Sequence, residues 1–62
     1  MERHWLFEVV DGEDEGVEFI VCAPAMPEAF QIAMAVFDEP TGLKCYGEIS
    51  EEEAEMSGLD EY

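Results

Sequence analysis

The fold is decided by residues 4–22, HWLFEVVDGEDEGVEFIVC, in which two apolar runs flank an acidic segment bounded by glycines. Residues 4–10 are rich in aromatic and β-branched types, and residues 17–22 place apolar side chains at alternate positions, so both runs predict β-strands. The Asp-Gly pair at residues 11–12 and Gly16 are typical of a turn. We therefore expect an antiparallel hairpin with the acidic residues at its tip.

A helix is predicted to follow the hairpin. Pro24 breaks the second strand, and Pro27 stands where the first turn of a helix accepts proline. The helix should run to about Phe37 or Asp38, because Pro40 disfavours helical backbone in the residue before it. Four apolar side chains recur at helical spacing and should pack on the sheet: Phe30, Ala33, Met34 and Phe37. Further apolar residues occupy the other sides, so that the helix is apolar nearly all round: Ala29, Ile32, Ala35 and Val36.

The last third of the chain predicts a strand and a short helix. After a turn at residues 40–42, residues 43–49 are typical of a third strand. Ser50 and Glu53 have the spacing of a capping box, and Gly58 is suited to end the helix that follows the cap. The predicted fold is therefore α+β, a single domain in the order ββαβα over the whole chain, 1–62. Its three-stranded, mainly antiparallel sheet should have the first strand in the middle, one long helix packed on a face, and a short C-terminal helix.

Negative charge dominates the composition. Seventeen of the 62 residues are Asp or Glu, only Arg3 and Lys44 are basic, and the formal net charge is -15. A hydrophobic content of 48% is nevertheless typical of a folded chain. No apolar run approaches the ~18 residues that cross a bilayer, and anionic lipid repels an anionic surface, so we expect no membrane association. The expected location is the cytoplasm, with Cys22 and Cys45 as reduced thiols that fill the core.

Few residue patterns suggest chemistry. The segment Asp11-x-Glu13-x-Glu15-Gly16 is similar to the start of a calcium-binding loop, but the position of the essential twelfth ligand is Cys22. His4 is the only histidine and has no cysteine near it in sequence, whereas zinc needs three or four ligands. The chain also lacks nucleophile-elbow and phosphate-loop motifs. We therefore expect no metal, no cofactor and no catalytic residue, so the protein should not be an enzyme.

The acidic residues gather in two regions, the predicted hairpin tip and the segment that ends and follows the third strand. Glu8 and Glu18 should lie opposite each other on the outward face of the hairpin. Like charges across a strand pair are destabilising, which indicates a surface kept for binding. The predicted partner-binding residues are Glu8, Asp11, Glu13, Asp14, Glu15, Glu18, Glu48, Glu51, Glu52 and Glu55.

The charge of the chain is comparable with that of a short DNA duplex. A globule of 62 residues should have a radius of gyration of about 11 Å and a diameter of about 25–30 Å. B-DNA of that length holds roughly 15–18 charges, and the chain has a net charge of -15. Its carboxylates could therefore replace phosphate oxygens as partners of Lys and Arg side chains.

Size, acidity and layout resemble those of the small DNA-mimic inhibitors of phages and plasmids, anti-CRISPR proteins in particular. Residues 47–62, GEISEEEAEMSGLDEY, look like the endings of small accessory proteins on mobile elements. The resemblance implies a protein of the host bacterial cytoplasm that covers the basic DNA-entry or PAM-recognition surface of a CRISPR surveillance complex, for example a type I Cascade. It implies no direct binding to nucleic acid. DNA mimics share no signature sequence, so no functional residue is transferred by alignment.

Two alternatives stay open. The apolar helix around Ile32 and Val36 would suit an adaptor or antitoxin-like interaction module, or a homodimer contact, with the acids serving solubility. An inhibitor of restriction, of uracil excision or of another basic DNA enzyme would differ from the first hypothesis only in its target.

Overall fold

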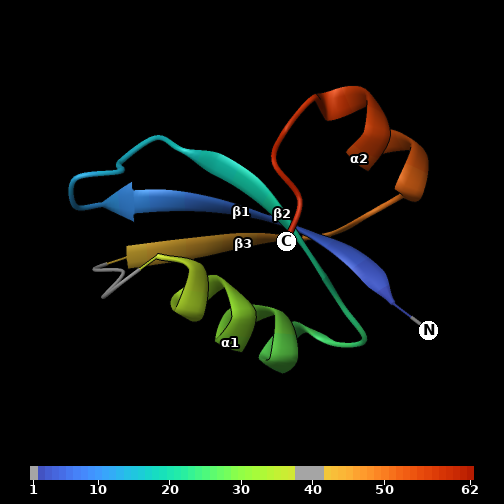
Figure 1. Ribbon diagram of the computed structural model, residues 1–62, viewed down its shortest axis with the longest axis horizontal. Helices are drawn as coiled ribbons and strands as arrows, with labels where there is room; N and C mark the ends of the chain where they lie inside the picture. Colours follow the sequence, from blue (N-terminus) through green and yellow to red (C-terminus); the bar gives the residue numbers. More distant parts are fainter. Residues whose placement is uncertain (1, 38–41) are drawn as a thin grey trace.

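The computed structural model, which describes residues 2–37 and 42–62, contains one antiparallel sheet in the order β2-β1-β3. β1 spans Arg3–Asp11, β2 spans Glu18–Ala23 and β3 spans Gly42–Ile49. Figure 1 shows β1 between its two neighbours. The predicted α+β class, the element order ββαβα and the central position of the first strand are therefore confirmed.

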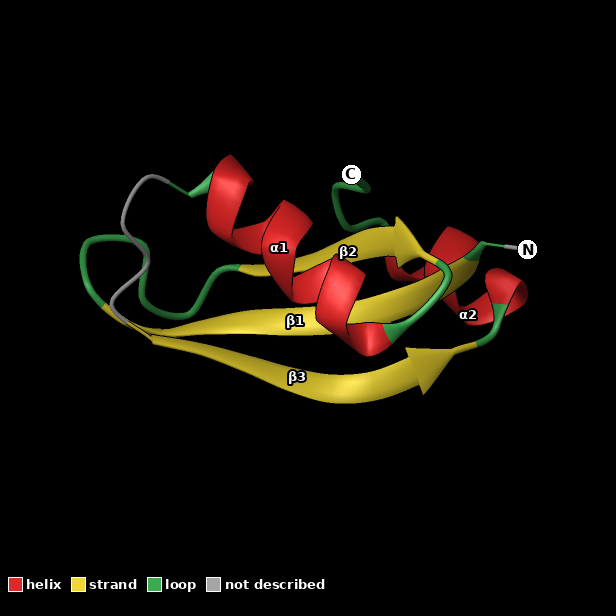
Figure 2. Ribbon diagram, turned by 90° about the horizontal axis from the view of Figure 1, so that it is seen from below, coloured by secondary structure: helices red, strands yellow, loops and turns green. Residues whose placement is uncertain are grey.

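The two helices lie on opposite sides of the strands (Figure 1). α1 spans Met26–Val36 and has a proline in its first turn, while α2 spans Glu51–Ser57. Figure 2 shows α1 lying along the sheet and α2 near one of its ends. The predicted cap of α2 is confirmed, because the Ser50 hydroxyl accepts a hydrogen bond of 3.0 Å from the backbone N–H of Glu53. Gly58 ends the helix in the left-handed conformation, at φ 71°.

The core fills the space between α1 and the sheet. Phe7 of the central strand is fully buried and stacks on Phe19 at 5.6 Å between ring centres. Phe30 of α1 meets the Phe7 ring edge-on at 4.9 Å. The indole N–H of Trp5 is satisfied by the backbone carbonyl of Ala23, at 2.9 Å. Among the described residues the buried cluster consists of Trp5, Phe7, Val9, Phe19, Val21, Ala23, Ala29 and Ala33.

α1 contacts the sheet through most of the predicted face, since Ala33 is in the core and Phe30 and Phe37 pack against it, but one predicted position is wrong. Met34 was expected in the core but is 55% exposed, whereas Ala29 was expected on another side and is fully buried. Ala29 and Ala33 are one helical turn apart, and their small side chains let the helix backbone approach the strands closely. The larger Phe30 and Phe37 then pack at the margins of this contact. The expected continuation of the helix to Asp38 and the turn at residues 40–41 lie outside the described residues.

The outward face of the sheet, which is the face away from α1, also holds a buried residue. The sequence alone did not assign this residue to the core. Ile20, which pairs with Leu6, is fully buried. At the free edge of β2 the C-terminal segment runs parallel to the strand, where Ile20 N–H bonds Asp60 O at 2.8 Å and Tyr62 N–H bonds Ile20 O at 2.8 Å. The chain therefore extends the sheet with its own last residues, an arrangement that no local pattern predicts.

The two cysteines are both free, as expected, but they do not share a core. Cys45 of β3 packs against the buried cluster under α1. Cys22 of β2 instead contacts His4 on the outward face, so its predicted place in the core is wrong. The two strands are separated by β1, which keeps the thiols apart.

Candidate functional site

The hairpin tip presents its carboxylates to solvent. The loop between β1 and β2 turns at Gly12 and Gly16, which have φ angles of 104° and 92°, a region that favours glycine. Part of its backbone is hydrogen-bonded within the loop, for example by a 2.9 Å bond from Gly12 N–H to Asp11 Oδ1 and a 3.2 Å bond from Glu15 N–H to Gly12 O. The acidic residues of this tip are all exposed: Asp11, Glu13, Asp14 and Glu15. We call them the hairpin-tip acids.

α2 presents a second group of carboxylates. Ala54 is the buried residue of this helix, at 4% exposure, and the glutamates around it are exposed. Negative charge is favourable in the first turn of a helix because it complements the helix dipole. We call Glu51, Glu52 and Glu55 the helix acids. The helix dipole thus offsets part of the repulsion among the glutamates of the first turn, Glu51, Glu52 and Glu53.

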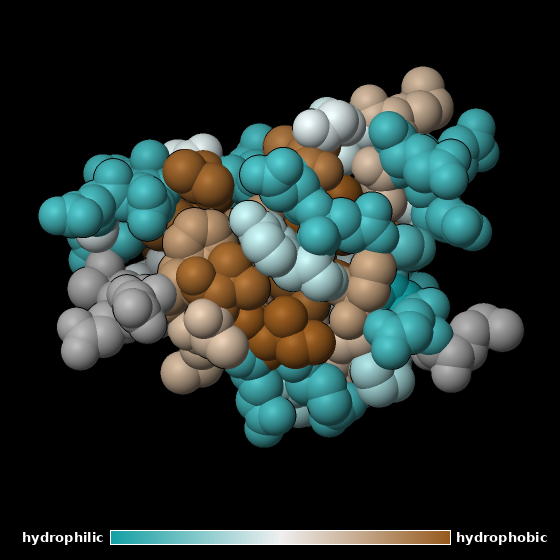
Figure 3. Space-filling model, in the orientation of Figure 1, coloured by the Kyte–Doolittle hydropathy of each residue, from teal (hydrophilic) through white to brown (hydrophobic). Residues whose placement is uncertain are grey.

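These two groups lie at opposite ends of the molecule. Figure 1 places the hairpin tip and α2 at the two ends of the longest axis, along which the molecule extends 29 Å. Figure 3 shows hydrophilic side chains at both ends, and between them a hydrophobic area beside further hydrophilic side chains. The radius of gyration is 10.7 Å, in agreement with the value expected from chain length. The hairpin-tip acids and the helix acids are therefore two separate groups, and the C-terminal segment, which contains the exposed Asp60 and Glu61, lies between them (Figure 1).

Glu8 and Glu18 lie opposite each other, as predicted, but Glu8 already has partners within the protein. It faces Lys44 across the β1–β3 pair and accepts a hydrogen bond from the Tyr46 hydroxyl. Tyr46 reaches it because the register shifts between Leu6 and Phe7, which leaves Tyr46 as an extra residue in β3. This hydrogen bond to a carboxylate raises the pKa of Tyr46. Glu8 is therefore only partly available to an external cation.

Glu48 is the other predicted binding residue with an internal partner. Its carboxylate forms a 3.4 Å ion pair with Arg3 on the surface. Surface pairs of this kind contribute little to stability, about 0–1 kcal/mol. Within the described residues the hairpin-tip acids, the helix acids and Glu18 have no basic partner. These residues form the candidate partner-binding surface.

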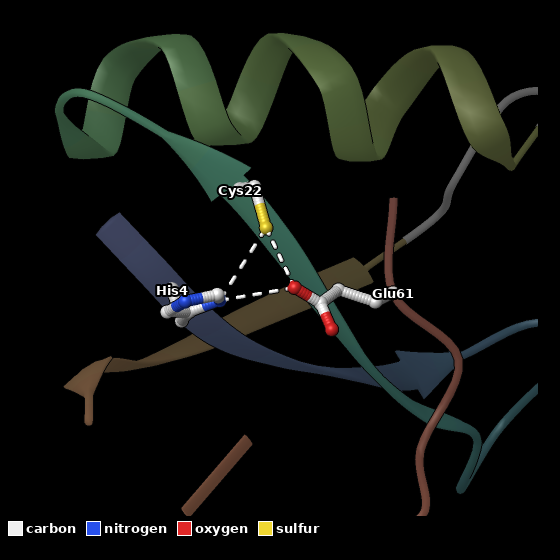
Figure 4. Close-up of side chains that lie close together, drawn as sticks. All are labelled: His4, Cys22 and Glu61. Atoms are coloured by element: carbon white, nitrogen blue, oxygen red, sulfur yellow. Dashed lines mark hydrogen bonds and ion pairs between the residues drawn. The ribbon is translucent and has the colours of Figure 1, made fainter. Parts of the chain in front are cut away.

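A separate cluster brings together His4, Cys22 and Glu61 (Figure 4). The Cys22 thiol donates to Glu61 Oε1 at 2.8 Å, and its sulfur lies 3.4 Å from His4 Nδ1. Glu61 Oε1 is also 3.1 Å from His4 Nδ1. His4 and Cys22 are half-buried and Glu61 is exposed. The described residues contain no other group of three or more such side chains within metal-binding distance.

The surroundings of Cys22 do not favour a nucleophilic thiolate. Burial, the hydrogen bond to Glu61 and the negative charges of Glu61 and Glu2 raise the pKa of Cys22 to about 11. A catalytic cysteine needs the opposite, a depressed pKa beside a cation. In the absence of a metal the thiol is therefore protonated near neutral pH. The Glu61 carboxylate accepts a hydrogen bond from the thiol itself, so it does not form a chain in which a carboxylate orients an imidazole that in turn activates the thiol.

The reason given from sequence against a metal centre does not hold in three dimensions. His4 has no cysteine near it along the chain, but β1–β2 pairing places it directly opposite Cys22. The pairing of the C-terminal segment with β2 then brings Glu61 next to these two residues. The strand alternation of the hairpin could have suggested the first contact, since His4 and Cys22 are both at outward positions. No sequence signal indicates the third.

No protein-family model, curated protein or solved structure matches this chain. Neither helix in the described part of the chain is long and apolar enough to cross a membrane.

Proposed function

We propose that the protein is a DNA mimic, an inhibitor that occupies the DNA-binding surface of a basic nucleic-acid-binding protein. One observation supports this most strongly, namely that exposed carboxylates without basic partners in the described structure lie at both ends of a molecule 29 Å long. A duplex of 29 Å carries about 17 phosphate charges. The net charge of -15 is close to this value.

The proposed mechanism is competitive occlusion. Carboxylates accept charge-assisted hydrogen bonds from Arg and Lys as phosphates do, and such bonds are about twice as strong as neutral ones. Two acidic groups separated along one axis can engage two basic patches that normally follow a DNA backbone. The negative field of the whole molecule speeds encounter with a basic partner. Both the association rate and the affinity should therefore fall as salt increases.

The target that we propose is a CRISPR surveillance complex, with a type I Cascade as the first candidate. This choice depends on the resemblance of size, charge and layout to anti-CRISPR proteins. In this role the protein acts in the cytoplasm of a bacterium, binds the basic PAM-recognition or DNA-entry surface, and makes no contact with nucleic acid.

The experiment is a mobility-shift assay with a type I Cascade and its target duplex. The complex is incubated with the protein before the duplex is added, and the fraction of bound duplex is measured. The unchanged protein should abolish binding, whereas Asp14→Lys and Glu52→Lys should each weaken inhibition at least about tenfold, since each removes a charge-assisted contact and adds a like charge. Glu28→Lys is the matched control. It changes net charge equally at an exposed position of α1 outside both acidic groups.

Two results would contradict the proposal. Direct binding of the purified protein to duplex DNA would show that it is not a mimic. Equal loss of inhibition for Glu28→Lys and for the two test variants would show that only net charge matters and that no acidic site exists. If the protein inhibited a different basic DNA enzyme and left Cascade unaffected, the DNA-mimic proposal would stand and the proposed target would be wrong.

A second candidate, an adaptor or homodimer that binds through α1, is supported by the exposure of Met26 and Met34, at 40% and 55%. Ile32 is not suitable for testing it because this side chain is partly buried against the core. Met34→Glu should abolish partner binding or dimerisation under this alternative. Under the mimic proposal it should leave inhibition unchanged.

A further inference from the structure

Three different kinds of metal-binding atom converge on the outward face of the hairpin, apart from the acidic surface of the proposed function (Figure 4). They are an imidazole nitrogen of His4, the sulfur of Cys22 and a carboxylate oxygen of Glu61. Each atom lies within 2.8–3.4 Å of the other two. Three donors packed this closely can all reach one ion.

The backbone holds these donors in place. His4 and Cys22 face each other across the antiparallel β1–β2 pair, an arrangement that fixes the spacing of their side chains. Glu61 lies on the segment that β2 holds by three backbone hydrogen bonds of 2.8 Å, one of them from Cys22 N–H to Tyr62 O. Sites on paired strands are positioned more accurately than sites on free loops. The cluster is therefore largely preorganised.

The donor set and its dimensions suit zinc. Bonds of about 2.3 Å to sulfur and about 2.0–2.2 Å to nitrogen and oxygen place the donors of a tetrahedral zinc ion roughly 3.3–3.6 Å apart. The separation of Cys22 and His4, 3.4 Å, already fits. The separations that involve Glu61, 2.8 and 3.1 Å, need to lengthen by less than about 1 Å, which this exposed side chain can accommodate by rotation. Calcium and magnesium prefer oxygen-only sites, and a thiolate excludes them.

We infer that His4 Nδ1, Cys22 Sγ and the Glu61 carboxylate bind one Zn²⁺ ion, with water in the fourth position. Binding replaces the hydrogen bond between the thiol and Glu61, and the thiol proton passes to solvent, one proton for each ion. The ion joins β1, β2 and the C-terminal segment. A domain of 62 residues has a small core, and a metal crosslink of this kind is a common way to stabilise such a fold.

The test uses Co²⁺ as a spectroscopic probe on protein freed of metal with a chelator. Co²⁺ should bind one to one, release one proton, and give the near-ultraviolet charge-transfer band of a cobalt–thiolate bond. Zn²⁺ should abolish this band, and excess Ca²⁺ should not. Cys22→Ser should eliminate the band, and His4→Gln and Glu61→Gln should each weaken binding at least about tenfold. Zn²⁺ at a hundred times its Kd should raise the Tm by roughly 10–20 °C.

Cys45→Ser is the matched control, because it removes the other thiol and leaves the cluster intact. The inference is overturned if Cys22→Ser and Cys45→Ser bind Co²⁺ equally well, since the ion would then be held by the diffuse acidic field. It is also overturned if the unchanged protein gives no thiolate band at saturating Co²⁺. Circular dichroism of each metal-free variant separates loss of a ligand from loss of the fold.

Discussion

Replacing Glu61 by Gln should make the Cys22 thiol ionise at lower pH. Burial is the largest cause that raises the pKa of this thiol from an ordinary value of 9.0 to about 11. The next two causes are the hydrogen bond that the thiol donates to Glu61 Oε1, at 2.8 Å, and the charge of Glu61. At pH 8, a pKa of 11 leaves about 0.1% thiolate, and full reversal to 9.0 would give about 10%. Because Cys22 stays buried in Glu61→Gln, the thiolate fraction at pH 8 should increase by only part of this hundredfold range.

The assay is the rate of alkylation by iodoacetamide between pH 7 and 10, with chelator present and in a Cys45→Ser background that leaves a single thiol. A tenfold gain in thiolate is partly offset by about a threefold loss of intrinsic nucleophilicity, so the rate at pH 8 should rise about threefold for each pKa unit recovered. Glu13→Gln, at the far end of the hairpin, removes the same charge and should have no effect. The geometry of the cluster would be refuted by an alkylation rate that is unchanged in Glu61→Gln. It would also be refuted if the alkylation rate of the parent reached half of its maximum near pH 9.

Four further predictions concern stability and are each checked by urea or thermal unfolding. The folded pKa of Cys22 lies above 9.0, so the stability that the neutral thiol provides is complete below pH 9 and is lost as pH rises through 11. The difference in the free energy of unfolding between the parent and Cys22→Ser should shrink between pH 9 and 11. Both proteins should carry Tyr46→Phe, because the pKa of Tyr46 is also raised. Ile20→Val should cost about 0.5–1.5 kcal/mol because the side chain is fully buried, whereas Met56→Ala, at 80% exposure, should cost less than about 0.5 kcal/mol. Ser50→Ala removes the cap of α2 and should cost about 1 kcal/mol; a change below about 0.3 kcal/mol would mean that α2 forms without it. Added salt should raise the Tm because it screens the repulsion within a chain of net charge -15, and a salt-independent Tm would contradict this.

The elements that sequence reasoning predicts correctly are those with local signals. The Asp-Gly turn and the alternating runs beside it predict the β1–β2 hairpin, and Ser50 predicts the start of α2. Each signal depends on residues within a few positions of one another. The exposed acidic tip follows for the same reason, because a short loop of charged residues has no apolar surface to bury.

The helix face that contacts the sheet could be chosen only in part from the sequence, which places Phe30, Ala33 and Phe37 correctly. α1 is apolar on most of its sides, so periodicity alone does not distinguish Met34 from Ala29 as a core residue. The choice is made by packing, since two alanines allow the closest approach to strands whose inward positions are already filled by large aromatic rings. Likewise, the register shift in β3 decides that Tyr46 meets Glu8, which leaves this predicted acid only partly available to a partner.

By itself, the sequence determined an acidic α+β domain, its order of strands and helices, and the two places where its charge is concentrated. These properties depend on composition and on neighbours along the chain. Only the tertiary structure decided which carboxylates are free and that His4, Cys22 and Glu61 meet, with up to 56 residues between them in sequence. Such meetings depend on strand pairing at long range, including the return of the last residues to the edge of β2, and no short window of sequence contains that information.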